Sequence, residues 1–151
     1  MSQSLAKVLI HVVFSTKYRY PFLAERGVRH EMHAYLGGTC NGIGCPVLSV
    51  GGAADHVHVV CRLSRNITMA KAIGDIKRSS SKWIKSKGKM LGKFAWQNGY
   101  GAFSVGESEL ERVLKYVEGQ EEHHQKKTFQ DEYRLFLREY GVEYDERFVW
   151  D

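Results

Sequence analysis

The order of strand-like and helix-like segments limits the fold of this chain more than any other feature. Short runs rich in β-branched and apolar residues alternate with helical patterns in the order β-α-β-β-α-β. The expected strands cover residues 8–15, 47–52, 56–63 and 102–105, and the expected helices between them cover residues 24–36 and 67–87. This order predicts an α+β fold: a ferredoxin-like or RRM-like antiparallel sheet with those helices on one face.

Two more helices are expected after the last strand. The first covers residues 108–125 and opens with a capping box, Ser108 followed by Glu111, and the second covers residues 130–140. The segment "GGAAD" predicts a hairpin before residues 56–63, which places that strand in the middle of the sheet and leaves the face without helices as a working surface. No linker is long enough to divide the chain, so residues 1–151 are expected to form a single domain.

Composition indicates an ordinary globular chain, with 43% hydrophobic and 26% charged residues. No apolar stretch approaches the roughly 20 residues of a membrane span, and the first residues lack the features of a signal peptide, so we expect a cytoplasmic protein without a membrane partner. The odd set Cys40, Cys45 and Cys61 predicts buried, reduced thiols. No second pair completes a zinc site with Cys40 and Cys45.

Charge is distributed unevenly along the chain. Residues 61–100 carry ten Lys and Arg and one acid, whereas residues 101–151 carry seven Lys and Arg and thirteen acids. A basic segment of this density favours a polyanion such as a nucleic acid as partner, although a solvated helix face has the same composition. The residues expected to contact phosphates are Lys17, Arg19, Lys71, Arg78, Lys82 and Lys85.

Two histidines interrupt the apolar run "DHVHVV". Residues two apart on a strand share one face, so His56 and His58 lie side by side while Val57 points the other way. Parallel imidazoles favour a divalent metal ion, although two strand histidines can also simply hydrogen-bond to their neighbours.

The helix after the last strand carries a second candidate pair. Tyr116 and Gln120 are four residues apart and share a helix face, and Gly119 between them indicates a close approach or a hinge. An amphipathic surface tyrosine would fit the same pattern. Combined with His56 and His58, however, the amide gives three ligands for Mg²⁺ or Mn²⁺, and the tyrosine is placed to attack a metal-bound phosphate.

Four segments in register resemble one known family. They are "HVVFSTKYRYPF" (11–22), "DHVHVV" (55–60), "FAWQNGYGAFSV" (94–105) and "YVEGQ" (116–120). They resemble the single-tyrosine HUH-endonuclease transposases of small bacterial insertion sequences and their REP-associated relatives. Residues 121–151 have no counterpart in this resemblance.

The resemblance implies cleavage and rejoining of single-stranded DNA through a 5′-phosphotyrosine intermediate that leaves a free 3′-OH. It implies Tyr116 as the nucleophile and His56, His58 and Gln120 as ligands of the divalent metal. It also implies recognition of subterminal DNA hairpins and an obligate homodimer, in which each tyrosine helix can complete the partner's active site.

Other interpretations remain open from the sequence. Tyr100 on the glycine loop "NGYG" is a rival nucleophile, although it lacks a partner ligand on a helix. A non-catalytic single-strand binder with an RRM-like sheet could stack bases on Tyr18, Tyr20, Trp96 and Tyr100. A cupin-type metal site needs later ligands on strands, and His123 and His124 instead follow a helix. His11 is expected beside the third strand, as a core residue or as a neighbour of the metal ligands.

Overall fold

The computed structural model describes residues 2–124 and 126–151, and its centre is one antiparallel sheet. The strands are β1 (Leu9–Ser15), β2 (Val47–Gly52), β3 (His56–Arg62) and β4 (Gly101–Val105). They lie in the order β2-β3-β1-β4, so the two middle strands are β3 and β1. The expected α+β topology, the β2–β3 hairpin and the central place of β3 are confirmed.

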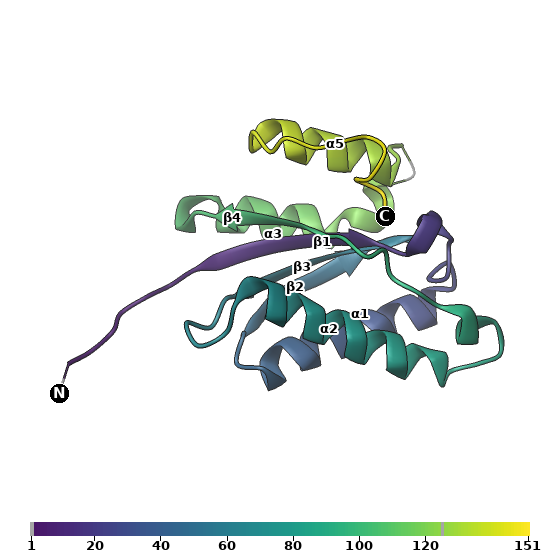
Figure 1. Ribbon diagram of the computed structural model, residues 1–151, viewed down its shortest axis with the longest axis horizontal. Coiled ribbons are helices and arrows are strands. Elements are labelled where there is room, and N and C mark those ends of the chain that lie inside the picture. Colours follow the sequence, from purple (N-terminus) through teal and green to yellow (C-terminus); the bar gives the residue numbers. More distant parts are fainter. Residues whose placement is uncertain (1, 125) are drawn as a thin grey trace.

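The first face of the sheet is covered by α1 (Arg26–Gly42) and α2 (Met69–Lys85) (Figure 1). The prediction that the first helix stops at residue 36 is wrong, because α1 continues through Gly37 and Gly38. Leu36 and Cys40 lie one turn apart on its buried side. Their burial outweighs a cost of about 1 kcal/mol for each helical glycine.

The main hydrophobic core lies between this face and the two helices. β1 and β3 contribute alternate residues to it, and α1 and α2 contribute residues at helical spacing. Its buried members include Val12, Phe14, Val57, Val59, Met32, Leu36, Ile73, Ile76 and Ile84. Cys40, Cys45 and Cys61 lie in the same core as free thiols, as the sequence predicts.

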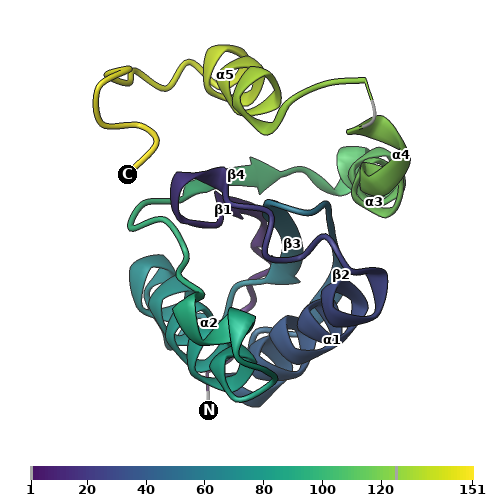
Figure 2. The ribbon, with the colours of Figure 1, turned by 90° about the vertical axis from the view of Figure 1, so that its right-hand side faces the viewer.

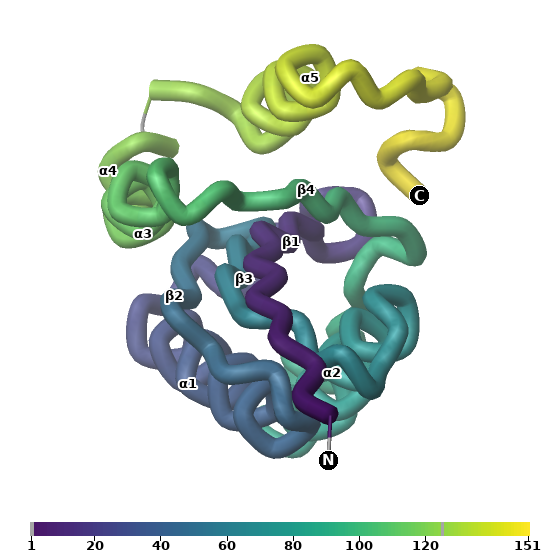
Figure 3. The backbone as a smooth tube through the Cα atoms, turned by 90° about the vertical axis from the view of Figure 1, so that its left-hand side faces the viewer, coloured from purple at the N-terminus to yellow at the C-terminus, as the bar shows by residue number. Residues whose placement is uncertain are grey.

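The second face is covered by the C-terminal helices α3 (Leu110–Glu118), α4 (Gln120–His123) and α5 (Phe129–Glu139). α3 and α4 lie over β2, and α5 crosses above β1 and β4 (Figures 2 and 3). The expectation of an open working surface on this face is therefore wrong. A smaller core made of Val13, Phe103, Phe129, Tyr133 and Leu137 holds α5 to the sheet.

The start and end of the tyrosine helix also differ from the prediction. Ser108 belongs to a short 3-10 turn, η3 (Glu107–Glu109), and its side chain makes no capping hydrogen bond, so the predicted capping box is wrong. The helix breaks at Gly119, and its expected end at residue 125 lies outside the described residues. Two further 3-10 turns are η1 (Lys17–Arg19) and η2 (Met90–Lys93).

Gly51 on β2 permits the close approach of the tyrosine helix to the sheet. A Cβ atom at this position would lie 2.2 Å from the backbone oxygen of Val117 on α3. Only glycine fits such a contact without displacement of the helix. Gly51 thus allows α3 to lie close to β2, next to the strand β3 that carries the two histidines.

None of the helices in the described part of the chain is both long and apolar enough to cross a membrane.

Candidate active site and metal centre

β3 presents His56 and His58 to the second face, beneath the C-terminal helices. Opposite them on β1 are Ser15 and Val13, in register with His56 and His58 respectively. Val57 between the histidines points into the main core, as strand alternation requires. Both imidazoles are completely buried.

The break at Gly119 places the two expected helix residues next to these histidines. Gln120 is 1% exposed, and its Oε1 lies 3.1 Å from Nε2 of His56. The ring of Tyr116 lies edge-on to that of His58, with centroids 5.8 Å apart. The structure thus brings together all four residues that the strand and helix patterns single out.

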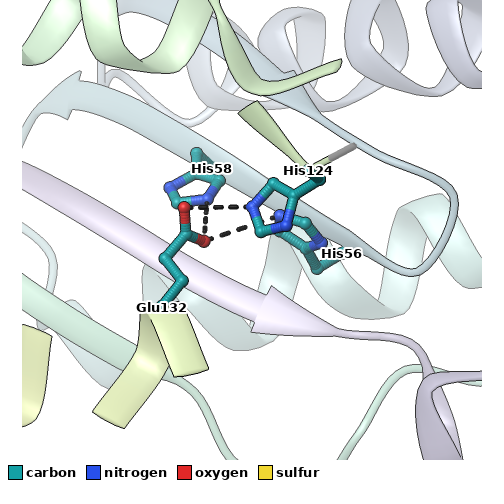
Figure 4. Close-up of side chains that lie close together, drawn as sticks. All are labelled: His56, His58, His124 and Glu132. Atoms are coloured by element: carbon teal, nitrogen blue, oxygen red, sulfur yellow. Dashed lines mark hydrogen bonds and ion pairs between the residues drawn. The ribbon is translucent and has the colours of Figure 1, made fainter. Parts of the chain in front are cut away.

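Two further residues complete the cluster (Figure 4): Glu132 on α5, which the sequence pattern does not single out, and His124 just after α4, which is set aside above because it follows a helix. Nε2 of His124 lies 3.0 Å from Oε2 of Glu132, and Nε2 of His58 lies 2.9 Å from Oε1 of the same carboxylate. The Tyr116 hydroxyl donates a hydrogen bond to Oε2 of Glu132.

The sequence did contain a signal for Glu132. On α5, Phe129, Tyr133 and Leu137 form a buried stripe at i, i+4 and i+8, and Glu132 lies on the same stripe at i+3. A buried carboxylate on the apolar side of a helix is rarely found without a hydrogen-bonding or charged partner. The positive end of the α5 dipole lies at the first turn and favours the negative charge of Glu132 there. The Thr128 side chain caps this end of α5 by accepting a hydrogen bond from Asp131 N.

Each of the three clustered histidines is held by its other ring nitrogen. Nδ1 of His56 lies 2.8 Å from the Asp55 carboxylate, and Nδ1 of His124 lies 2.6 Å from the backbone oxygen of Lys127. Nδ1 of His58 lies 2.7 Å from Nε2 of His11, which is therefore a neighbour of the cluster as well as a buried residue. This arrangement directs three Nε2 atoms inward, which is how metal-binding histidines are commonly oriented.

Burial sets the charge states of the cluster. It lowers the pKa of His58 to about 4 and the pKa of His11 to about 3, so both imidazoles are neutral at pH 7. Burial alone would raise the pKa of Glu132, but hydrogen bonds to His124 and His58 hold that pKa below its usual range. Burial and the Glu132 charge raise the pKa of Tyr116, so its hydroxyl is protonated at neutral pH.

The donor set fits a divalent metal ion. Among the described residues, the one His/Cys/Asp/Glu group with suitable spacing is His56, His58, His124 and Glu132, whose ligand atoms all lie within 4.8 Å of one another. Three imidazole nitrogens and a carboxylate suit Mn²⁺ or another first-row transition ion better than Mg²⁺, which prefers oxygen ligands. The cluster can therefore hold a divalent cation.

A cavity of about 200 Å³ lies between α3 and α5, on the side of the cluster where Tyr116 lies. Tyr116, Glu132, Phe136 and Glu139 are among its lining residues. It offers a route toward Tyr116 from outside, whereas the histidines behind Tyr116 are sealed from solvent.

The predicted phosphate-contacting residues lie elsewhere. Lys71, Arg78, Lys82 and Lys85 are exposed on α2, across the sheet from the histidine cluster. The last three line a groove of about 830 Å³ between α2 and the loop 95–100. Lys71 and Arg78 are both paired with Asp75.

Lys17 and Arg19 follow β1 in η1, apart from the α2 stripe. Lys17 Nζ lies 5.6 Å from the centre of the Tyr18 ring. Arg19 donates a hydrogen bond to the Trp150 backbone oxygen at 2.7 Å, so part of its hydrogen-bonding capacity is used within the chain.

The aromatic residues considered for base stacking differ in exposure. Tyr18 and Tyr20 are exposed, but Trp96 is buried against Phe14 and donates to Ser80 Oγ, so its expected role as a stacking surface is wrong. Tyr100 packs against the main core on the α2 side of the sheet. That position separates this rival nucleophile from the histidines.

Known proteins share both the sequence pattern and the fold. Residues 4–120 match the family model described as "Transposase IS200 like". A candidate transposase from Deinococcus radiodurans R1 is similar in structure, with a TM-score of 0.62 and 20% identity over 80% of this chain and 98% of that one.

A REP-associated tyrosine transposase bound to a REP hairpin also shares the fold, with a TM-score of 0.56 and 12% identity over 78% of this chain and 70% of that one. No curated protein matches the chain. The family model spans well over half of the sequence and ends at Gln120, and the chain therefore belongs to the IS200-like transposase family.

Proposed function

We propose that this transposase cleaves and rejoins single-stranded DNA at the ends of an insertion sequence, with Tyr116 as nucleophile and a divalent metal ion held by His56, His58 and Gln120. The observation that carries the proposal is the meeting of these residues in one cluster, although they lie on three elements, β3, α3 and α4, and Tyr116 follows His58 by 58 residues in the sequence. The match to the transposase family supports the same reaction class.

The covalent step exchanges one phosphate ester for another. The Tyr116 oxygen forms a bond to the scissile phosphorus while the bond from phosphorus to the 3′ oxygen breaks, which leaves a 5′-phosphotyrosine and a free 3′-OH. The phenolic proton leaves toward the neighbouring acceptors, Glu132 Oε2 and His123 Nε2, the latter 3.4 Å from the hydroxyl, and the departing 3′ oxygen gains a proton.

Rejoining reverses these steps: a 3′-OH attacks the phosphotyrosine and the tyrosine regains its proton. A bound divalent cation would supply charge stabilisation to the phosphate oxygens. The neutral imidazole of His58 would leave that positive charge uncancelled, and the buried site would strengthen its effect.

Subterminal DNA hairpins are the proposed recognition element. The similar REP-associated transposase is bound to a REP hairpin, which supports this part of the proposal. Lys17, Arg19 and the α2 residues Lys71, Arg78, Lys82 and Lys85 are the proposed phosphate contacts. Since the α2 residues lie across the sheet from Tyr116, we propose that the hairpin binds one side of the protein while the scissile strand reaches the other.

The experiment that tests the reaction uses 3′-labelled single strands carrying the hairpins that flank the gene. With Mn²⁺, the wild-type protein should give a labelled adduct that survives denaturing electrophoresis, and Tyr116→Phe should give none. Tyr100→Phe is the matched control and should give a normal adduct. Hairpin binding with no adduct from the wild type would instead favour the non-catalytic single-strand binder.

The proposed assembly is a homodimer, and the edges of the small sheet offer pairing surfaces. In this one chain, Tyr116 and Gln120 dock against the chain's own histidines. If the dimer keeps that arrangement, mixing His56→Ala/His58→Ala protein with Tyr116→Phe protein should restore no cleavage. Recovered cleavage would show that the tyrosine helix exchanges between subunits, and a monomeric mass in light scattering would contradict the dimer.

A further inference from the structure

One carboxylate, that of Glu132, contacts almost every group of the site. Its Oε1 faces the strand histidines, 2.9 Å from Nε2 of His58 and 3.6 Å from Nε2 of His56. Its Oε2 accepts hydrogen bonds from the Tyr116 hydroxyl and from Nε2 of Gln120, the latter at 3.1 Å. Oε1 therefore faces the two strand histidines, whereas Oε2 faces the proposed nucleophile, Gln120 and Nε2 of His124, which lies 3.0 Å away.

Packing of α5 does not explain this carboxylate. Glu132 is 1% exposed and lies beside Phe129 and Tyr133 on the buried stripe, where an apolar side chain would dock the helix at lower cost. Burial of an ionised carboxylate is costly unless an opposite charge accompanies it. Its contacts within the described residues are histidines, an amide and a phenol, and none of these is a permanent cation.

A divalent cation between Glu132 and the histidines would supply the missing positive charge. Oε1 of Glu132 and the inward Nε2 atoms of His56 and His58 lie close enough together to share one ion. Oε2 would keep its contacts with the Tyr116 hydroxyl, Gln120 and His124 beside that ion.

We infer that Glu132 is a further catalytic residue of the proposed reaction, because its Oε1 binds the metal ion together with His56 and His58 while its Oε2 orients the Tyr116 hydroxyl toward the phosphate. This inference rests on the proposed role of Tyr116. It adds a ligand from α5 to the set of two histidines and Gln120, and it gives the helix that covers the site a part in the chemistry.

The proposed metal-binding role of Glu132 is tested without DNA. The full-length chain is titrated with Mn²⁺, and the free ion is followed by electron paramagnetic resonance. Glu132→Gln should weaken Mn²⁺ binding by at least about tenfold, since even indirect partners of metal ligands commonly contribute that much. Glu139→Gln is the matched control: it removes one carboxylate from the same helix, at the wall of the same cavity, and should leave the affinity unchanged. Tyr116→Phe should also leave it unchanged.

The proposed role of Glu132 in orienting the Tyr116 hydroxyl is tested by measuring adduct formation at saturating Mn²⁺. If Glu132 served the metal alone, excess Mn²⁺ would restore the rate of Glu132→Gln to that of the wild type. We expect the rate to stay at least about tenfold lower, because a misdirected nucleophile is not corrected by the metal. Glu132→Asp keeps the charge but shortens the reach by one methylene, so it should show the same defect while circular dichroism confirms the fold.

Three outcomes would overturn the inference. Unchanged Mn²⁺ affinity in both Glu132→Gln and Glu132→Asp removes Glu132 from the ligand set. Full recovery at saturating Mn²⁺ removes the orienting role. Faster adduct formation in Glu132→Gln means that the carboxylate blocks the site. If the wild type itself forms no adduct, the proposed function fails, whereas the Mn²⁺ titration still decides the ligand role.

Discussion

The two faces of the sheet use the same strands in different ways. Toward α1 and α2, β1 and β3 present Val12, Phe14, Val57 and Val59, which form a continuous apolar core. Toward α3, α4 and α5, the same strands present polar side chains, among them His56 and His58, at equally complete burial. The first face contributes stability through apolar contacts, whereas the second combines a smaller apolar core with a buried polar cluster around an ionised carboxylate.

This difference shows how a small transposase can hold its candidate active site inside the fold. Alternation along β3 lets this strand carry core residues on one side and the candidate ligands His56 and His58 on the other, so the rigid core fixes the positions of the histidines. The cost of the polar face is offset by the smaller core around Phe129, Tyr133 and Leu137, which holds α5 in place. Mutations on the first face should therefore affect stability, and those on the second face should affect chemistry.

The largest effect is expected from the second face. His58→Ala removes an inward Nε2 and should reduce adduct formation to background, a loss of at least about a hundredfold, as should EDTA. His30→Ala, which removes an exposed histidine outside the cluster, serves as the control and should cleave normally. Persistent cleavage by His58→Ala, or in EDTA, would contradict a metal-dependent reaction on the second face.

The first face should respond in the opposite way. Ile73→Ala on α2 opens a cavity in the main core and should lower the free energy of unfolding by about 2–5 kcal/mol. Below its melting temperature, the variant should form the adduct at close to the wild-type rate, as measured alongside urea unfolding. An adduct rate that falls as far as in His58→Ala would show that the two faces are not separable.

Gly51→Ala tests the junction between the faces. The added Cβ would clash with the Val117 backbone oxygen and push α3 away from β2, so we expect a loss of about 1–3 kcal/mol together with slower adduct formation. Gly38→Ala is the matched control, because a Cβ there meets nothing within 4 Å and alanine favours the helix. Wild-type rates in Gly51→Ala would mean that the close approach of α3 is unnecessary.

The smallest effect is expected for the outer surface of α2. Lys82→Ala combined with Lys85→Ala should weaken binding of the hairpin DNA and reduce the slope of log affinity against log salt by about 0.7–0.9 for each lost phosphate contact, the upper value for contacts to the duplex stem. Lys115→Ala, an exposed lysine of α3, should change the slope less. An unchanged slope in the double variant would remove the groove from the DNA-binding surface.

The sequence predicts the first face far better than the second. Alternation in β1 and β3 and the helical spacing of α2 are local patterns, so they identify the sheet, its main core and the inward histidines. The pair Tyr116 and Gln120 is likewise readable from one helical turn. These patterns therefore predict which side chains share a face, but not which element covers that face.

For that reason His124 was set aside from the sequence and Glu132 was not singled out. His124 enters the cluster from the end of α4, and Glu132 enters it because α5 folds back across the sheet, where Phe136 stacks on Phe103, far away in sequence. The length of α1 was missed for a similar reason, since burial of Leu36 and Cys40 overrides the glycines between them. In both cases tertiary packing decides what local propensity leaves open.

The central claim is that Tyr116, on the polar face, forms the covalent bond to DNA. The most direct measurement is mass spectrometry of the adduct after nuclease and protease digestion, which locates the residual nucleotide on a peptide. We expect the added mass on the peptide containing Tyr116, with fragmentation that places the phosphate on the tyrosine oxygen. A nucleotide on Tyr100, which lies on the α2 side of the sheet, would contradict the account.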